Sequence, residues 1–167
     1  SVRRHSAAAA CLADLPPELP AALAVLASRY VDHKGGFSFY GDASGRARKT
    51  SAVDTDYQLI LSHPRFQELG RQIHYPQANP KVADRWAATN AMFCNAAGQR
   101  RMFVDPNCKH LIRDLEGRAY KGNTREASDP AGSDIGHITD AMDYAVYKLF
   151  PVRLKVASVS RVIINAG

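Results

Sequence analysis

Two aspartates, far apart in the chain, have side chains that can bind a divalent cation. Asp42 follows the alternating stretch 37–40 and lies in the glycine-containing turn 41–45, a pattern that predicts the end of a strand. Asp140 falls in the first turn of a predicted helix, 136–150. An α/β fold can bring a first-strand acid and a last-helix acid to one sheet edge. Paired carboxylates there can hold two Mg²⁺ or Mn²⁺ ions for phosphodiester hydrolysis.

A histidine and three cations are the other candidates. His137 precedes Asp140 by three residues on the same helix face, where it either assists the reaction, holds the acid or is structural. Arg46, Arg48 and Lys49 follow the first aspartate in a polar loop that either contacts phosphates or is simply solvated. An aspartate after a strand is also a common turn or cap residue, so Asp42 has a purely structural interpretation as well.

Helices alternating with short strands are expected to position these residues. The strands are predicted at 36–42, 71–75 and 101–104. The helices are predicted at about 21–31, from the Thr55–Gln58 capping box to near Pro64, from Asn79-Pro80 to about Asn95, from Asp105-Pro106 to Gly117, and at 136–150. This order predicts an α/β fold with a small mixed central sheet flanked by helices. The apolar face of 136–150 is expected to pack on the sheet.

Within these helices, apolar spacing separates packing residues from exposed ones. Val82, Trp86 and Phe93 share a face, and Asp84 lies about 200° from Val82 at 100° per residue, so Asp84 is expected in solvent. Cys108 belongs to the apolar stripe of its helix, which favours a packing role over a nucleophilic one.

Composition narrows the class of protein. The 167 residues suffice for one domain with a sizeable core, and a formal charge of +6 favours a polyanionic partner such as nucleic acid. The three cysteines show no CxxC spacing, which argues against a disulfide framework or a cysteine-rich zinc site and favours a reducing cytoplasm. No apolar run reaches the roughly 18 to 20 residues that span a bilayer, so no membrane association is expected.

Five motifs, taken in order, resemble a known family. They are GDASG at 41–45, TDYQLI at 55–60, NPKVADR at 79–85, NAMFCNAAGQRRMFVDPNCKHLIRDLEG at 90–117 and GHITDAMDYAV at 136–146. The ordered set resembles the nuclease domain of tailed-bacteriophage terminase large subunits. The resemblance covers about residues 36–150, with 1–35 as a linker and entry helix and 151–167 as a C-terminal tail.

The resemblance implies a ribonuclease H-like fold and a two-metal endonuclease that cuts concatemeric viral DNA during genome packaging. It also implies a setting in the cytoplasm of the infected bacterial host. The implied partners are double-stranded DNA, a terminase small subunit, the portal, and an ATPase domain of the same polypeptide. No GxxxxGK[ST] phosphate loop occurs in this sequence, so the chain is expected to be the nuclease half alone.

By the resemblance, Asp42 matches the first-strand metal ligand and Asp140 the acid of the final helix. The middle ligand departs from the family's pattern, because the second strand is followed by Gln77-Ala78-Asn79-Pro80 and not by an acid. Asn79 through its carbonyl oxygen, Asp84 from one turn further on, or Asp56 from the first helix can fill that place.

Two other functions compete with the terminase nuclease. Another ribonuclease H-like nuclease, such as a junction resolvase, would use the same acids. A non-catalytic DNA-binding module would use the basic loop and keep the acids only as caps. Dependence on a metal separates the enzymes from the binding module.

Overall fold

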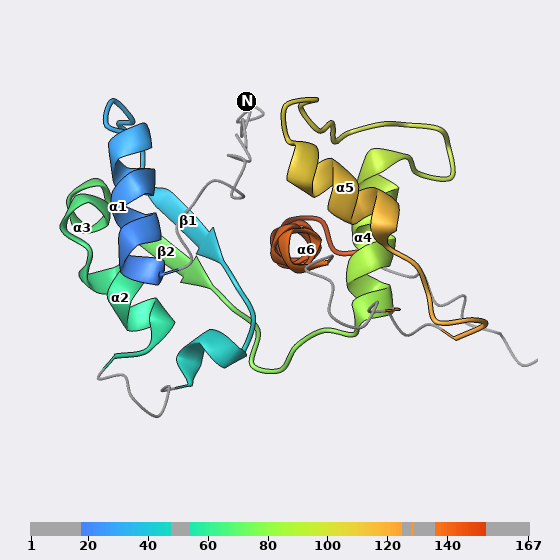
Figure 1. Cartoon of the computed structure of the whole chain (residues 1–167), viewed down its shortest axis with the longest axis horizontal. Helices are drawn as coiled ribbons and strands as arrows, with labels where there is room; N and C mark the ends of the chain where they lie inside the picture. Colours follow the sequence, from blue (N-terminus) through green and yellow to red (C-terminus); the bar gives the residue numbers. More distant parts are fainter. Residues whose placement is uncertain (1–17, 48–53, 125–127, 129–135, 153–167) are drawn as a thin grey trace, which may run out of the picture.

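The computed structural model describes residues 18–47, 54–124, 128 and 136–152. Helix α1 (Leu19–Arg29) leads into strand β1 (Phe37–Tyr40) and the short 3-10 helix η2 (Ser44–Arg46). Helices α2 (Asp56–Ser62) and α3 (Pro64–Leu69) then lead into strand β2 (Arg71–His74). Helices α4 (Val82–Phe93), α5 (Lys109–Gly117) and α6 (His137–Leu149) complete the described part of the chain. Figure 1 shows these last three helices grouped beside the sheet-containing half, with α6 nearest the strands.

The two strands form a parallel pair, so the predicted α/β class is confirmed. Phe37 pairs with Arg71 and Tyr40 with His74. Parallel neighbours need a crossover connection, which here contains α2 and α3. Within the described residues the sheet has only these two strands and is not mixed as predicted.

The predicted strand at 101–104 is wrong. Its residues have no strand pairing, and Phe103 is 79% exposed. The backbone N–H groups of Arg101 and Met102 instead donate to the carbonyl of Met92 at 2.9 and 3.0 Å. The segment therefore folds back onto the end of α4. This contact uses two backbone N–H groups that hydrogen bonding to a neighbouring strand would require.

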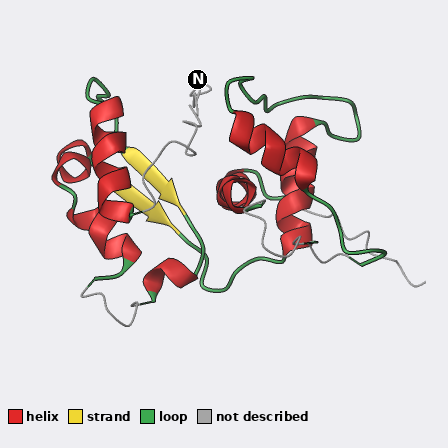
Figure 2. Ribbon diagram, viewed as in Figure 1, coloured by secondary structure: helices red, strands yellow, loops and turns green. Residues whose placement is uncertain are grey.

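One apolar core lies between the sheet and helices α1 to α3, which cover one face of the strands (Figure 2). Its buried residues are Leu23, Tyr57, Ile60 and Phe66, with the first-strand phenylalanines packed against them. The Phe66 ring meets those of Phe37 and Phe39 edge-on, at centroid distances of 4.9 and 5.0 Å. Alternation along β1 sends Ser38 and Tyr40 to the opposite face.

Local sequence signals explain where most helices begin. The Thr55–Gln58 capping box is present in full and opens α2, while Pro64 occupies the first turn of α3. The predicted start of α4 at Asn79-Pro80 is wrong, since α4 begins at Val82 with Lys81 as its N-cap.

The predicted Asp105-Pro106 cap is also wrong. Helix α5 begins at Lys109 with Cys108 as its N-cap. Asp105 accepts a hydrogen bond from the backbone N–H of Asn107 at 2.8 Å and so organises a turn ahead of the helix. Cys108 is buried, as its place in the apolar stripe predicted.

Helix α6 packs mainly on α4 and α5 and less extensively on β1, which corrects the predicted sheet packing. Its buried residues are Thr139, Asp143 and Val146, whereas Leu149 of the predicted face is 50% exposed. Asp143 can be fully buried because its carboxylate accepts a hydrogen bond from the Thr89 hydroxyl and forms an ion pair with Arg118. The apolar pattern of α6 did not predict this burial, which is tolerated because both partners satisfy the charge.

A second buried carboxylate fixes the start of α6. Asp114 of α5 accepts hydrogen bonds from the backbone N–H groups of Gly136 and Ile138, both at 3.1 Å. These N–H groups have no partner within the helix, and the positive end of the helix dipole favours the negative charge beside them. Gly136 has a φ of 109°, a left-handed conformation that suits glycine.

Candidate functional site

The Asp42 carboxylate organises the turn that follows β1. It accepts hydrogen bonds from the backbone N–H of Ser44 at 3.0 Å and of Gly45 at 3.2 Å. The Ser44 hydroxyl donates to the same carboxylate, 2.7 Å from Oδ1 and 2.8 Å from Oδ2. The structural interpretation of Asp42 as a turn residue is therefore correct, and any metal-binding role has to coexist with these bonds.

Tyr57 of α2 fits inside this turn. Its hydroxyl donates to the backbone carbonyl of Asp42 at 2.5 Å, and its ring stacks on Tyr75 with centroids 4.9 Å apart. A Cβ atom at Gly41 or Gly45 would lie 2.4 or 2.7 Å from the nearest Tyr57 atom, so both positions exclude a side chain. Burial, and then the charge of Asp42, raise the pKa of Tyr57 to about 12. The glycines of GDASG and the tyrosine of TDYQLI therefore form one packing unit.

The segment after β2 runs alongside the same turn. The Asn79 Oδ1 atom accepts a hydrogen bond from the backbone N–H of Ala43 at 2.7 Å. Arg46 donates to the carbonyl of Gln77 at 2.9 Å and lies over the Tyr75 ring, 5.2 Å from its centroid. Asn79 is thus brought next to the Asp42 turn, as a middle ligand would have to be. Arg46 joins the turn after β1 to the segment after β2, a structural role that the predicted DNA contact did not anticipate.

Asp140 comes from the first turn of α6 and pairs with a buried arginine. Arg85 Nη1 lies 3.0 Å from Asp140 Oδ1, and the Arg85 side chain is only 4% exposed while that of Asp140 is 48% exposed. The guanidinium also lies over the Tyr144 ring, 4.3 Å from its centroid. Arg85 fixes one carboxylate oxygen of Asp140 and leaves the carboxylate open to solvent on another side.

Tyr144 links the two aspartates. Burial is the largest influence that raises the pKa of Tyr144; the Arg85 guanidinium opposes it, and the carboxylates of Asp42 and Asp140 both add to it. A carboxylate acts on a phenol in this way only at short range, because solvent screens distant charges. The charges of both Asp42 and Asp140 therefore act on the phenol of Tyr144, which lies one turn after Asp140 on α6.

The other predicted residues lie elsewhere or outside the described residues. Asp84 is exposed on α4, as predicted, and Asp56 is the first residue of α2. His137 is the exposed first residue of α6. Arg48 and Lys49 fall outside the described residues, so the structure does not address their role.

Sequence reasoning missed Arg85, Tyr57 and Tyr144 as site residues. Arg85 was overlooked because a charged residue on an amphipathic helix is ordinarily exposed. Its spacing from Trp86 and Val82 gave no sign that it would be buried. Tyr57 had a sequence signal, since two glycines close together around an aspartate indicate a backbone that another group approaches closely.

The residue types fit a hard cation such as Mg²⁺ or Mn²⁺. Asp42, Asp140 and Asn79 offer carboxylate and amide oxygens, which these ions prefer. In the described part of the chain, no three side chains of His, Cys, Asp or Glu form a group that could hold a metal ion. The available set is therefore two carboxylates and one amide.

Comparisons with known proteins add no family assignment. The sequence matches no family model, and no curated protein or solved structure is significantly similar to the chain. Among the helices that the structure describes, none combines the length and the apolar character needed to cross a membrane.

Proposed function

We propose that this chain is the nuclease domain of a phage terminase large subunit and that it cleaves double-stranded DNA with the help of Mg²⁺ or Mn²⁺ ions. The observation that carries the proposal is that Gly41, the residue before Asp42, and Tyr144, one turn after Asp140 on α6, line the same pocket. Helix α6 also contacts β1, so the two elements that carry the acids lie beside each other. The ordered motifs that resemble the terminase family support the same function.

In this proposal, Asp42 and Asp140 hold the ions, and Asn79 adds its carbonyl oxygen. Bound metal ions supply an activated water and neutralise charge on the leaving oxygen. Arg85 keeps the Asp140 carboxylate in one orientation, and Tyr57 keeps the Asp42 turn in its shape. The Ser44 hydroxyl competes with a cation for both Asp42 oxygens, so metal affinity without DNA is expected to be low.

The resemblance also supplies the proposed context. The substrate is concatemeric viral DNA in the cytoplasm of an infected bacterium. The partners are an ATPase domain of the same polypeptide, the terminase small subunit and the portal. The formal charge of +6 favours DNA as the partner.

Plasmid cleavage with Mg²⁺ or Mn²⁺ tests the proposal. Asp42→Asn and Asp140→Asn should each lower the cleavage rate about 100-fold or more, because each removes a charged oxygen ligand. Asp32→Asn, which changes an exposed acid after α1, is the matched control and should cleave like the parent. Equal cleavage by Asp42→Asn and the parent, with both folded by circular dichroism, would contradict the proposal.

A non-catalytic DNA-binding module is the second candidate. The observation that favours it is the engagement of both acids by the chain itself, Asp42 by Ser44 and Asp140 by Arg85. This candidate predicts DNA binding that is unchanged by EDTA, together with no cleavage in either metal. The same plasmid assay therefore decides between the two functions.

A further inference from the structure

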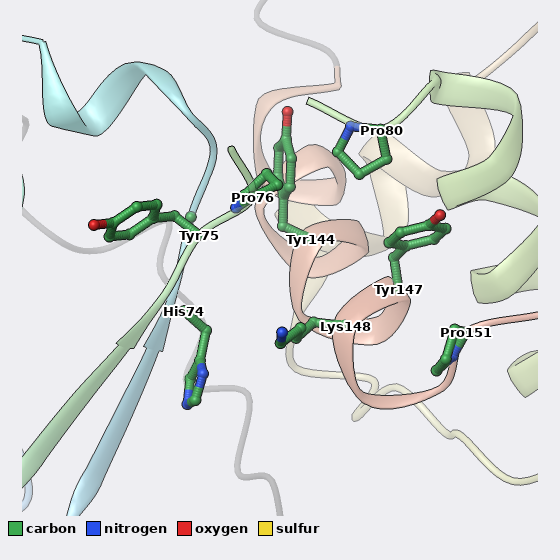
Figure 3. Close-up of a pocket in the computed structure, with 9 residues that line it drawn as sticks. His74, Tyr75, Pro76, Pro80, Tyr144, Tyr147, Lys148 and Pro151 are labelled. Atoms are coloured by element: carbon green, nitrogen blue, oxygen red, sulfur yellow. The ribbon is translucent and has the colours of Figure 1, made fainter. Parts of the chain in front are cut away.

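A pocket of about 340 Å³ lies between the end of β2 and the last turns of α6 (Figure 3). Gly41, the residue before Asp42, contributes to its wall, and so does Tyr144. The pocket therefore lies beside the candidate metal site, whose residues Asp42 and Asn79 each adjoin a lining residue in the sequence. The remaining lining residues are His74, Tyr75, Pro76, Pro80, Tyr147, Lys148 and Pro151.

The walls combine flat rings with one flexible cation. Figure 3 shows Lys148 extending from α6 toward the side of the pocket formed by the end of β2. Lys148 is exposed, whereas Tyr147 is half-buried and packs on the core cluster that contains Met92 and Val146. Rings and prolines suit a flat apolar ligand, and a lysine ammonium beside them suits an anionic group on that ligand.

Two of the aromatic rings are already held by other parts of the protein. The Tyr75 ring stacks on the Tyr57 ring with centroids 4.9 Å apart, and the Arg46 guanidinium lies over the Tyr75 ring, 5.2 Å from its centroid. His74 stacks on Tyr40 with centroids 4.7 Å apart. These contacts make one wall rigid before any ligand arrives, which lowers the entropic cost of binding.

The ligand that fits this chemistry and size is a single nucleotide. A base stacks on aromatic side chains regardless of its identity, and its phosphate suits a lysine. A volume of about 340 Å³ lies at the small end of the range for ligand pockets, which is too small for a stacked base pair with its backbones. A nucleotide that enters must therefore leave its stack or already be unpaired.

We infer that this pocket binds one unpaired nucleotide of the DNA strand, next to the phosphate that faces Asp42 and Asp140. The relation to cleavage rests on the proposed function, whereas the binding itself needs no metal. The inference adds a local substrate preference: the strand is unpaired, frayed or opened beside the cut.

The test measures binding to the full chain in EDTA, where no cleavage occurs. The first probe is a fluorescein-labelled oligothymidylate, and the second is a duplex with one unpaired fluorescent adenine analogue whose emission stacking quenches. Tyr147→Leu should weaken oligothymidylate binding about fivefold or more and reduce the quenching, since an aliphatic side chain packs but does not stack. Tyr147→Phe keeps the ring and should bind like the parent.

Lys148→Ala changes an exposed residue and so tests the pocket without a packing defect. It should weaken binding and lower the salt dependence, because one phosphate contact is lost. Lys121→Ala removes an exposed cation outside the pocket lining and is the matched charge control.

Parent-like affinity of both Tyr147→Leu and Lys148→Ala would overturn the inference. Equal competition by a fully paired duplex and by the oligothymidylate would overturn it as well. Metal-dependent plasmid cleavage, together with parent-like DNA binding by Tyr147→Leu and Lys148→Ala, would refute the nucleotide site and leave the proposed nuclease intact. Weaker oligothymidylate binding by these two variants, together with no plasmid cleavage in Mg²⁺ or Mn²⁺, would refute the proposed nuclease and leave the nucleotide site intact.

Discussion

Alanine at Gly41 and at Gly45 tests whether Tyr57 shapes the turn that carries Asp42. Neither glycine has a positive φ, so an alanine meets no left-handed backbone strain, and the nearest atoms that oppose its Cβ all belong to Tyr57. At Gly45, an ideal Cβ would lie 2.7 Å from Cζ and 2.9 Å from Cε2 of the ring. At Gly41, the nearest atom is the hydroxyl oxygen at 2.4 Å, and the ring carbons are 3.2 Å away.

These distances predict different responses to the removal of the hydroxyl. Each alanine should lower the free energy of unfolding by about 1–3 kcal/mol, as overpacking usually does. In the Tyr57→Phe background, Gly41→Ala should cost at least ~0.5 kcal/mol less, because its closest clash is gone. Gly45→Ala should cost the same in both backgrounds, because it meets ring carbons that remain.

Urea unfolding of the parent, the three single variants and the two double variants measures these differences. Tyr57→Phe alone should cost about 0.5–1.5 kcal/mol, the usual net value of one hydrogen bond. An identical cost of Gly41→Ala in both backgrounds would refute the close approach of Tyr57 to this turn. If Tyr57→Phe rescued both alanines equally, the orientation of the ring described above would be wrong.

Three further predictions concern stability. The pKa of Tyr57 is raised to about 12, so the unfolded chain loses this proton at a lower pH than the folded chain does. The free energy of unfolding should therefore fall as the pH rises from about 10 to about 12. Urea unfolding midpoints should show this fall, and Tyr57→Phe should make it smaller. Asp143→Ala should cost about 3–5 kcal/mol by thermal or urea unfolding, because Arg118 is left as a buried, unpaired charge; a cost below that of Thr89→Val would contradict this reasoning. Thr55→Ala should cost about 1 kcal/mol through loss of the capping box, and an unchanged urea midpoint would show that the cap does not support α2.

Local signals in the sequence predicted the elements that local chemistry controls. The capping box at Thr55, the break at Pro64 and the strand that ends before Asp42 are all present. Each depends on residues only a few positions apart. Asp105 shows the limit of this reasoning, since the same turn chemistry that predicts a cap also satisfies a turn ahead of the helix.

Features that depend on distant partners could not be predicted in this way. Asp143 was outside the predicted apolar face of α6, yet it is buried because Arg118 and Thr89 reach it from other elements. The four residues 101–104 have strand-like composition, but no strand among the described residues pairs with them. For the candidate site, the sequence predicted Asp42, Asp140 and Asn79. It did not predict Arg85, because Arg85 reaches Asp140 only through the packing of α4 on α6.

The Asp114 carboxylate ties the start of α6 to α5. Because α5 holds the first N–H groups of α6 directly, the turn that carries Asp140 depends on a residue of another helix. A substitution of Asp114 should therefore disturb the ion pair between Asp140 and Arg85 as well as the start of α6.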